Sequence, residues 1–248
     1  MCLEPRGCSG ARSRSASDRR AQVIRQNFDQ QKISEARSNF REIAEDYIPA
    51  RAIEPDGALL DIFDLPTDEA SLEELIRDLF ENHWHEITFG TLIQGAVWEI
   101  KADKAPTKIG MLDGYITVAF GIPHFHICIG EHKGFRPNPT SPELARHRRT
   151  SRAELFRRHA RTCVPMSWGV RLFNGANEQQ MTVLLPNPFL HPETDRPLRE
   201  PDWARLALWD KLRNRWFDLN SPDPVDRSGG FYAESDQRVS CRSPCLFR

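Results

Sequence analysis

The chain has 248 residues, of which 39% are hydrophobic and 28% are charged, and its formal net charge is −1. These values are ordinary for a globular protein and leave no bulk charge that would attract the chain to nucleic acid or to an anionic membrane. No apolar run reaches the roughly 18–20 residues that span a bilayer. The amino terminus has no apolar signal-peptide core, so we expect a cytoplasmic protein whose six cysteines are thiols.

The two ends of the chain are poor in regular patterns. Residues 1–17 are rich in Arg, Ser and Gly and carry too little apolar surface to order themselves. Residues 18–47 have a helix-forming composition with an imperfect apolar period, so residues 1–52 are expected to be a disordered leader and a helical extension. Periodicity is lost again from residue 221, which predicts a disordered tail over 221–248. A single domain is therefore expected over residues 53–220.

The first half of this domain reads as a strand, a helix and three further strands. GALLDIF, residues 57–63, predicts a strand, and from Ser71 onward apolar residues recur at the i, i+3, i+4 spacing of an amphipathic helix. Three runs rich in β-branched and aromatic residues follow, joined by short polar links. Together they predict an antiparallel three-strand meander, with its strands over residues 88–102, 109–121 and 124–129.

The second half reads as a helix, a hairpin and a last helix. Thr140-Ser-Pro-Glu marks a helix start, and the arginine-rich stretch after it extends the predicted helix over 142–161. Residues 167–173 and 178–186 flank Asn174-Gly175, which predicts a hairpin. The last helix contains Trp203 and Trp216. The predicted fold is one α+β domain, an antiparallel sheet of a three-strand meander plus a hairpin, with helices packed on one face.

The stretch PHFHICIGEH, residues 123–132, holds three of the eight histidines of the chain. Side chains alternate along a strand, so His124, His126 and Cys128 are expected to share one face. Imidazole and thiolate are ligands that zinc and ferrous iron accept. The sequence therefore predicts a mononuclear Zn or Fe(II) site on this strand.

Strand geometry leaves two possible ligand sets. Side chains that follow each other on one face of a strand stand roughly 6–7 Å apart. His124 and Cys128 are two such steps apart, which is too far for them to bind the same ion. In the first set His124 and His126 bind, helped by Glu131 or by a group from another strand. In the second set His126 and Cys128 bind, with His132 returning after a turn at Gly130. The first set, with Glu131, resembles half of the metal motif of the cupin family over this short stretch.

The same residues allow readings without a metal. The cluster could line a pocket for a ligand other than a metal, or Cys128 could act as a nucleophile beside His126 or His132. Alternatively, these residues have no functional role and are simply polar side chains on a solvent-exposed face of the sheet. If a metal binds and activates water, Glu131 is the candidate general base. Other residues could hydrogen-bond the metal ligands and fix their orientation. The candidates are His83, His85, Glu99 and Asp113.

Arginine is concentrated in the predicted helix over 142–161. Seven arginines and only two glutamates lie between residues 141 and 162. This pattern is typical of a solvated helix face, but it also fits a clamp for a carboxylate or phosphate, with Arg148, Arg149 and Arg152 as the candidate residues. The absence of interleaved aromatic residues does not favour nucleic acid.

The amide-rich hairpin adds further candidate ligand contacts. Asn174, Asn177, Gln179 and Gln180 lie around its turn, and the run of residues 177–180 that enters the second strand could hydrogen-bond a bound molecule. Two functions follow. The first is a metal-binding protein, including a metal-dependent hydrolase or oxygenase acting on a small anionic substrate. The alternative is a non-catalytic binding module that holds a cofactor such as haem or docks an acidic protein through its arginine-rich helix.

Overall fold

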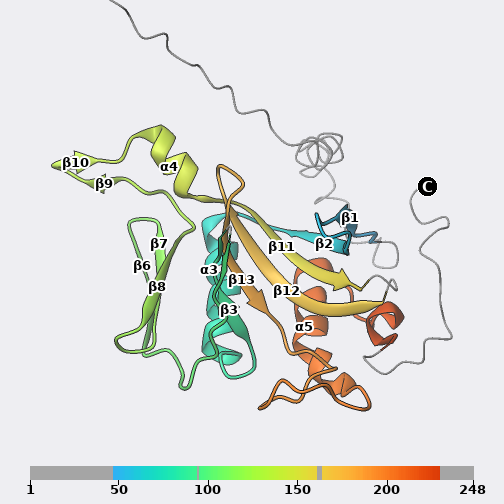
Figure 1. Ribbon diagram of the computed structural model, residues 1–248. Coiled ribbons are helices and arrows are strands. Elements are labelled where there is room, and N and C mark those ends of the chain that lie inside the picture. Colours follow the sequence, from blue (N-terminus) through green and yellow to red (C-terminus); the bar gives the residue numbers. More distant parts are fainter. Residues whose placement is uncertain (1–46, 94, 161–163, 230–248) are drawn as a thin grey trace, which may run out of the picture. The chain divides into compact units, whose positions relative to one another are not determined.

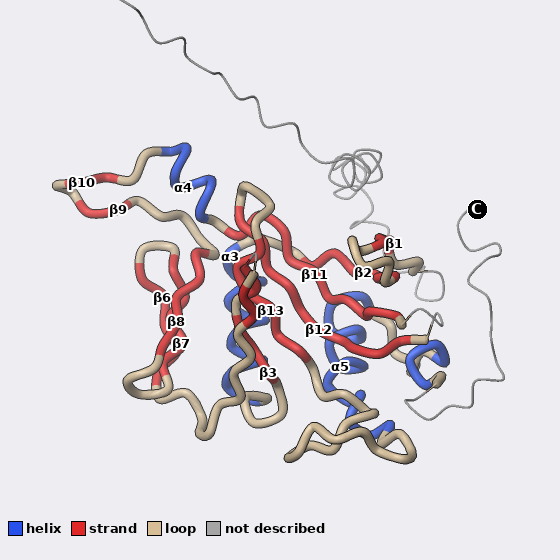
Figure 2. The backbone as a smooth tube through the Cα atoms, viewed as in Figure 1, coloured by secondary structure: helices blue, strands red, loops and turns tan. Residues whose placement is uncertain are grey.

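A six-stranded antiparallel sheet is the largest element of the computed structural model, which describes residues 47–93, 95–160 and 164–229. The strand order is β1-β2-β11-β12-β13-β3 (Figures 1 and 2). The strands are β1 (Ala50–Ile53), β2 (Leu59–Leu65), β11 (Thr150–His159), β12 (Pro165–Asn174), β13 (Gln179–Leu184) and β3 (Thr88–Gly90). The strand predicted over 57–63 and the predicted hairpin are confirmed as β2 and as β12–β13.

A three-stranded antiparallel sheet stands apart from the large one and contains the histidine strand. It consists of β6 (Lys108–Leu112), β7 (Tyr115–Ala119) and β8 (His124–Cys128) in that order. The run 109–121 was predicted as one strand, which is wrong, because Asp113 and Gly114 take φ values of 48° and 78° and turn the chain into a hairpin. A three-strand meander is thus present, but residues 108–128 alone form it as a separate sheet, and the first predicted strand, 88–102, takes no part in it.

The long strand predicted over 88–102 is also wrong. This run contains β3 and a two-stranded ribbon of β4 (Leu92–Ile93) and β5 (Ala96–Val97), so the chain doubles back. A second ribbon, β9 (Gly134–Phe135) with β10 (Asn138–Pro139), leads into the following helix.

Three α-helices are described. Helix α3 (Glu69–Arg77) is capped by Asp68, whose side chain accepts a hydrogen bond from the Ser71 amide, so the helix begins before the predicted Ser71. A π-helical turn, η2 (Asp78–Asn82), continues it. The others are α4 (Pro142–Arg148) and α5 (Ala207–Phe217), the latter preceded by the 3-10 turn η3 (Trp203–Leu206).

The predicted helix over 142–161 is wrong beyond Arg148. The chain leaves α4 at Arg149, whose backbone is extended (φ −65°, ψ 139°), and continues as β11. Strand β11 pairs with β2 on one side and with β12 on the other. Those two ladders satisfy its backbone, so tertiary pairing overrides the local preference for helix.

A single core joins both larger sheets to α3 and α5. Alternate residues of β7 such as Ile116 and Val118 are fully buried with Leu155 of β11 and Val170 of β12. Because alternate residues point oppositely, the intervening side chains of β7 and β8 lie on the outer face of the three-stranded sheet. The fold is α+β with antiparallel sheets, as predicted.

The structure extends beyond the predicted domain limits of 53 and 220. Strand β1 begins within residues 1–52, the segment predicted to be a leader and a helical extension. At the other end, the 3-10 turn η4 (Pro224–Arg227) lies within the predicted disordered tail, yet its Asp226 is fully buried. The described residues belong to one compact unit, Ala44–Arg248. Most of the predicted helical extension over 18–47 lies outside the described residues, and no helix within the described ranges is long and apolar enough to cross a membrane.

A buried ionic network fixes η4 to the large sheet. The Arg157 guanidinium on β11 donates to Asp61, at 2.7 Å, and to Asp226, at 3.1 Å. The indole N–H groups of Trp168 and Trp209 donate to the two carboxylate oxygens of Asp226, at 2.8 and 2.7 Å. These partners explain how so many charges are buried without being left unpaired.

Candidate functional site

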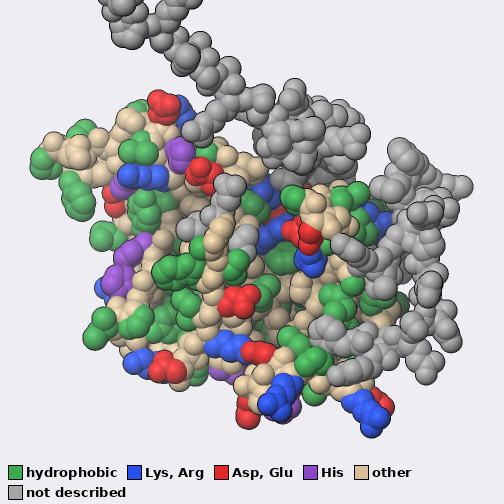
Figure 3. Space-filling view, in the orientation of Figure 1, with side chains coloured by type: hydrophobic (Ala, Val, Ile, Leu, Met, Phe, Trp, Pro, Cys, Tyr) green, Lys and Arg blue, Asp and Glu red, His purple; other side chains and the backbone are tan. Residues whose placement is uncertain are grey.

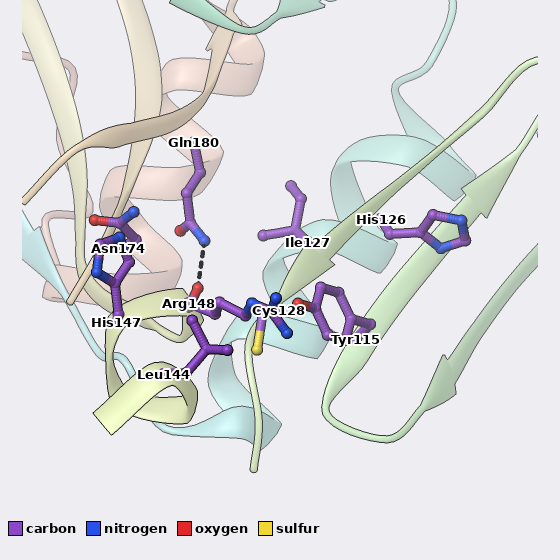
Figure 4. Close-up of a pocket in the computed structure, with 9 residues that line it drawn as sticks. All are labelled: Tyr115, His126, Ile127, Cys128, Leu144, His147, Arg148, Asn174 and Gln180. Carbon is purple, nitrogen blue, oxygen red and sulfur yellow. Dashed lines mark hydrogen bonds between the residues drawn. The ribbon is translucent and has the colours of Figure 1, made fainter. Parts of the chain in front are cut away.

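A cavity of about 410 Å³ lies between the three-stranded sheet, α4 and the β12–β13 turn. Figure 4 shows the residues that line it. No acidic residue is among them, whereas Arg148 and His147 bring basic groups from α4. The lining residues are Tyr115, His126, Ile127, Cys128, Leu144, His147, Arg148, Asn174 and Gln180.

Strands β7 and β8 supply one wall of the cavity. Tyr115 pairs with Cys128 and Thr117 with His126 across the two strands. The predicted strand over 124–129 is confirmed, and its alternation places Cys128 and His126 on the same face as Tyr115. The His126 ring turns away from the other lining side chains in Figure 4, since its Nδ1 lies 2.7 Å from the Thr117 hydroxyl.

Helix α4 supplies the opposite wall and is tied at its end to the large sheet. Ser141 caps its start and Pro142 occupies the first turn, as the sequence predicted. At its end, the Gly175 amide donates to the His147 carbonyl and the Gln180 carboxamide donates to the Arg148 carbonyl, each at 2.9 Å. These bonds hold the last turn of α4 against the hairpin.

Arg148 is positioned by a chain of polar groups that ends at a turn of the small sheet. Its Nη1 lies 3.1 Å from Nε2 of His132, and Nδ1 of His132 lies 2.9 Å from the Asp113 carboxylate. A guanidinium only donates, so Nε2 accepts and Nδ1 carries the proton toward Asp113. The Asp113 carboxylate also accepts from the backbone amides of Lys133 and Gly134. These hydrogen bonds lower the pKa of Asp113, and the bond from the Lys133 amide has the largest effect.

The arginines of this region divide into two groups by their partners. On β11, Arg152 pairs with Glu154, Arg157 with Asp61, and Arg158 with Glu54. Within the described part of the chain, by contrast, the exposed Arg148 forms no salt bridge to a carboxylate. A cation without a counter-ion therefore borders a cavity without acidic side chains.

The other two predicted anion-binding arginines lie elsewhere. Arg149 lines a second cavity, of about 580 Å³, together with Arg146 and Thr150. Arg152 is already occupied, because it pairs with Glu154, bonds the Asn177 side chain at 3.0 Å and lies over the Phe173 ring. Only Arg148 of the three faces the cavity beside the histidine strand.

The Cys128 thiol is buried at the floor of the cavity. Its Sγ lies 3.7 Å from the Gly130 carbonyl oxygen. Burial raises the pKa of Cys128, and the nearby charges of Arg149 and Arg148 oppose this only in part. A thiol that stays protonated at neutral pH is a poor nucleophile, so the geometry does not favour the nucleophile reading.

The structure separates the predicted metal ligands. His124 and His126 are neighbours on the exposed end of β8, whereas Cys128 is buried and His132 is held by Asp113, Thr140 and Arg148. In the described ranges, no group of three or more His, Cys, Asp or Glu side chains is placed to hold a metal ion. The predicted general base, Glu131, is exposed, lies 3.2 Å from the Lys133 ammonium and does not line the cavity.

Of the four residues predicted to support the ligands, only Asp113 contacts the site. His83 belongs to a separate surface cluster, with Nδ1 2.5 Å from Glu86 and Nε2 2.9 Å from Lys211. His85 packs against the ring of Trp84, and Glu99 is exposed.

Five lining residues were not identified as ligand contacts from the sequence: Tyr115, Ile127, Leu144, His147 and Asn174. Tyr115 and His147 reach one cavity because α4 docks against the small sheet, which no local pattern reveals. Gln180 belongs to the run 177–180 that the sequence predicts as candidate ligand contacts, whereas the Asn174 carboxamide serves the turn, because its oxygen accepts from the amides of Ala176 and Glu178.

Comparison with known proteins gives a family and a distant likeness. The sequence matches a family model over residues 49–218, and the model is described as a family of unknown function (DUF7676). No curated protein matches the sequence. Among solved structures, one similar chain is described as "Crystal structure of ChuX". It has 14% identity and a TM-score of 0.38, and the similarity covers 62% of this chain and 78% of that one. What the site does must follow from its own residues.

Proposed function

The chain belongs to the DUF7676 family of unknown function, and we propose that it is a binding protein for a small anionic molecule held in the Arg148 cavity. The single observation that carries this proposal is the unpaired state of Arg148. Within the described residues its guanidinium has no carboxylate partner, and it is oriented by His132 beside a cavity that no acidic side chain lines.

The lining groups indicate what the ligand looks like. Arg148 offers a planar set of donors suited to a carboxylate or phosphate, and the Tyr115 hydroxyl adds a neutral hydrogen-bonding group. The Asn174 carboxamide is already bonded within the hairpin, to Glu178 and to the Ala176 amide. Ile127 and Leu144 supply apolar surface. The cavity therefore fits a small molecule with a phosphate or carboxylate at one end and an apolar portion at the other.

The proposal keeps the anionic ligand predicted from the sequence and locates it at one arginine. It does not require a metal or a catalytic base, so hydrolysis, oxygenation and haem binding stay predictions without a residue of this cavity assigned to them. Docking of an acidic protein through the stretch 142–161 also stays a prediction, with the arginines of this stretch divided between α4 and β11.

Calorimetric titration tests the proposal with inorganic phosphate, pyrophosphate and citrate as probes. Arg148→Ala removes the guanidinium, and Arg136→Ala is the matched control, since Arg136 is also exposed but lines neither cavity. Charge-assisted hydrogen bonds contribute about 1.5–3 kcal/mol, so we expect Arg148→Ala to weaken binding of at least one probe roughly 10- to 100-fold.

The control variant should bind that probe as the native protein does. Binding should also weaken as salt is raised, because both partners are charged. Equal affinities for the native protein and Arg148→Ala, or no binding of any probe, would contradict the proposal. Preference between phosphate and citrate then tells which kind of anionic group the cavity accepts.

A further inference from the structure

The two exposed imidazoles of β8 have a separation that is compatible with binding one metal ion. The ring centroids of His124 and His126 are 5.0 Å apart, and the ring planes are inclined at 73°. A ring centroid lies about 3.2 Å from a metal that one of its nitrogens binds at about 2.0–2.1 Å. Two rings at the observed separation then subtend about 100° at the metal, between square-planar and tetrahedral values.

Each ring is held by the nitrogen that a metal would not use. Nδ1 of His124 lies 2.9 Å from the Ile122 carbonyl oxygen, and Nδ1 of His126 lies 2.7 Å from the Thr117 hydroxyl. A carbonyl can only accept, so Nδ1 of His124 carries the proton and Nε2 keeps its lone pair. This arrangement, with Nδ1 anchored and Nε2 available, is the one found in metal-binding histidines.

The residues of β7 that pair with the two histidines are small: Ala119 is paired with His124, and Thr117 with His126. On β6, Gly110 is paired with Thr117, and the exposed Lys108 is paired with Ala119. Both imidazoles are exposed, and neither Nε2 has a hydrogen-bond partner in the ranges that the structure describes. Figure 3 shows histidine side chains (purple) open on the face over the three-stranded sheet.

We propose that His124 and His126 bind one divalent transition-metal ion, Cu²⁺ or Zn²⁺, through their two Nε2 atoms. Imidazole nitrogen suits both ions, and Cu²⁺ binds more tightly at a given nitrogen site. The remaining coordination positions are filled by water or by a ligand from outside the chain. The site keeps His124 and His126 of the first ligand set predicted from the sequence but not its Glu131, and it uses neither Cys128 nor His132 of the second set.

The metal site and the anion-binding cavity share one residue, His126. His124 does not line the Arg148 cavity, and the His126 ring turns away from it toward Thr117. Arg148→Ala is therefore expected to leave metal binding unchanged, whereas His124→Asn should leave phosphate binding unchanged. Failure of one proposal would not affect the other.

The test uses the full chain without a histidine tag, titrated with Cu²⁺ and with Zn²⁺ in a calorimeter. Variants His124→Asn and His126→Asn each remove one ligand, and His191→Asn is the control, because His191 is another histidine whose ring lies outside β8. We expect one equivalent of metal whose affinity falls by roughly tenfold or more in either ligand variant and is unchanged in the control. Thr117→Val should also weaken binding, because it frees the His126 ring.

Electron paramagnetic resonance of the Cu²⁺ complex identifies the donors even if other groups of the chain also bind copper. The spectrum should show splitting from two nitrogen donors, and each single variant should reduce it to one. If the native protein and both ligand variants bind Cu²⁺ and Zn²⁺ with the same affinity, or the copper spectrum is unchanged by both substitutions, the proposal is wrong.

Discussion

His132 and Arg148 come from different parts of the fold and meet at 3.1 Å, between the imidazole Nε2 and the guanidinium Nη1. His132 follows the small sheet and is fixed by Asp113, whereas Arg148 ends α4. The contact therefore joins the two walls of the cavity. The same contact fixes the orientation of the Arg148 guanidinium.

If His132 acts through Arg148, replacing it should weaken anion binding without removing it. His132→Phe keeps a ring beside Tyr115, whose centroid is 5.0 Å from that of His132, but it cannot accept a hydrogen bond. Loss of one hydrogen bond of about 1 kcal/mol predicts a several-fold weaker affinity for the best anionic probe.

A double-mutant cycle separates this positioning role from a general structural one. In the Arg148→Ala background, His132→Phe should have little further effect, because the group it positions is gone. A loss that simply adds to that of Arg148→Ala would show that His132 does not act through Arg148.

Gly175 should be required for the docking of α4. A Cβ atom at this position would lie 2.0 Å from the Arg146 carbonyl oxygen, so α4 and the hairpin would have to move apart. We expect Gly175→Ala to lower the free energy of unfolding by about 1–3 kcal/mol and to weaken anion binding. Gly110→Ala is the control, since the nearest atom to its Cβ would be the flexible Lys108 side chain at 3.7 Å. Equal effects of the two substitutions in denaturant titrations would contradict this role.

Acid should destabilise the protein through Asp61. Burial alone would raise the pKa of this carboxyl, but hydrogen bonds from His159 and Arg157 and the charge of Arg157 hold the pKa well below its ordinary value. The folded state thus favours the ionised form. This stabilisation is complete above the unfolded pKa of about 3.9 and is lost as the pH falls toward the lower folded pKa.

Urea titrations at several pH values test this assignment with Asp61→Asn. Breaking a buried ion pair costs about 3–5 kcal/mol, so the variant should be less stable near neutral pH. Because asparagine does not titrate, its stability should fall less steeply than that of the native protein below about pH 4. Asp195→Asn, which removes an exposed partner of Lys101, should change neither quantity appreciably. Parallel acid profiles for the native protein and Asp61→Asn would contradict the assignment.

Asp226 should contribute strongly to stability although it lies in the predicted tail. Asp226→Ala would leave the indole N–H groups of Trp168 and Trp209 buried without their acceptor and would remove one counter-ion of Arg157. We expect a loss of about 3–5 kcal/mol in the free energy of unfolding and a changed tryptophan fluorescence spectrum. Native-like stability and fluorescence would show that η4 is not part of the folded core.

Local patterns predicted those parts of the fold that depend on near neighbours. The alternation of His124, Phe125, His126 and Ile127 predicted β8. The spacing of Leu72, Leu75, Ile76 and Leu79 predicted the helix formed by α3 and η2, whose apolar face is buried. Asn174-Gly175 likewise predicted the β12–β13 hairpin. Each of these signals lies within a few residues of the element that it specifies.

The arginine-rich segment could not be assigned from local pattern alone. Arg157 resembles a solvated helix residue in the sequence, but its partners Asp61 and Asp226 lie 96 and 69 residues away. The same holds for the cavity, because Tyr115 and His147 become neighbours only when α4 docks on the small sheet. Predicting the site required the tertiary pairing of β11, which the sequence pattern does not contain.

A crystal structure of the protein soaked in tungstate, a heavy analogue of phosphate, tests the central claim most directly. Anomalous scattering locates the bound anion without reference to any assumed ligand. The claim predicts a tungsten peak in the cavity beside the guanidinium of Arg148, and its loss in Arg148→Ala crystals. Peaks only at other cationic groups, with none in the cavity, would contradict it.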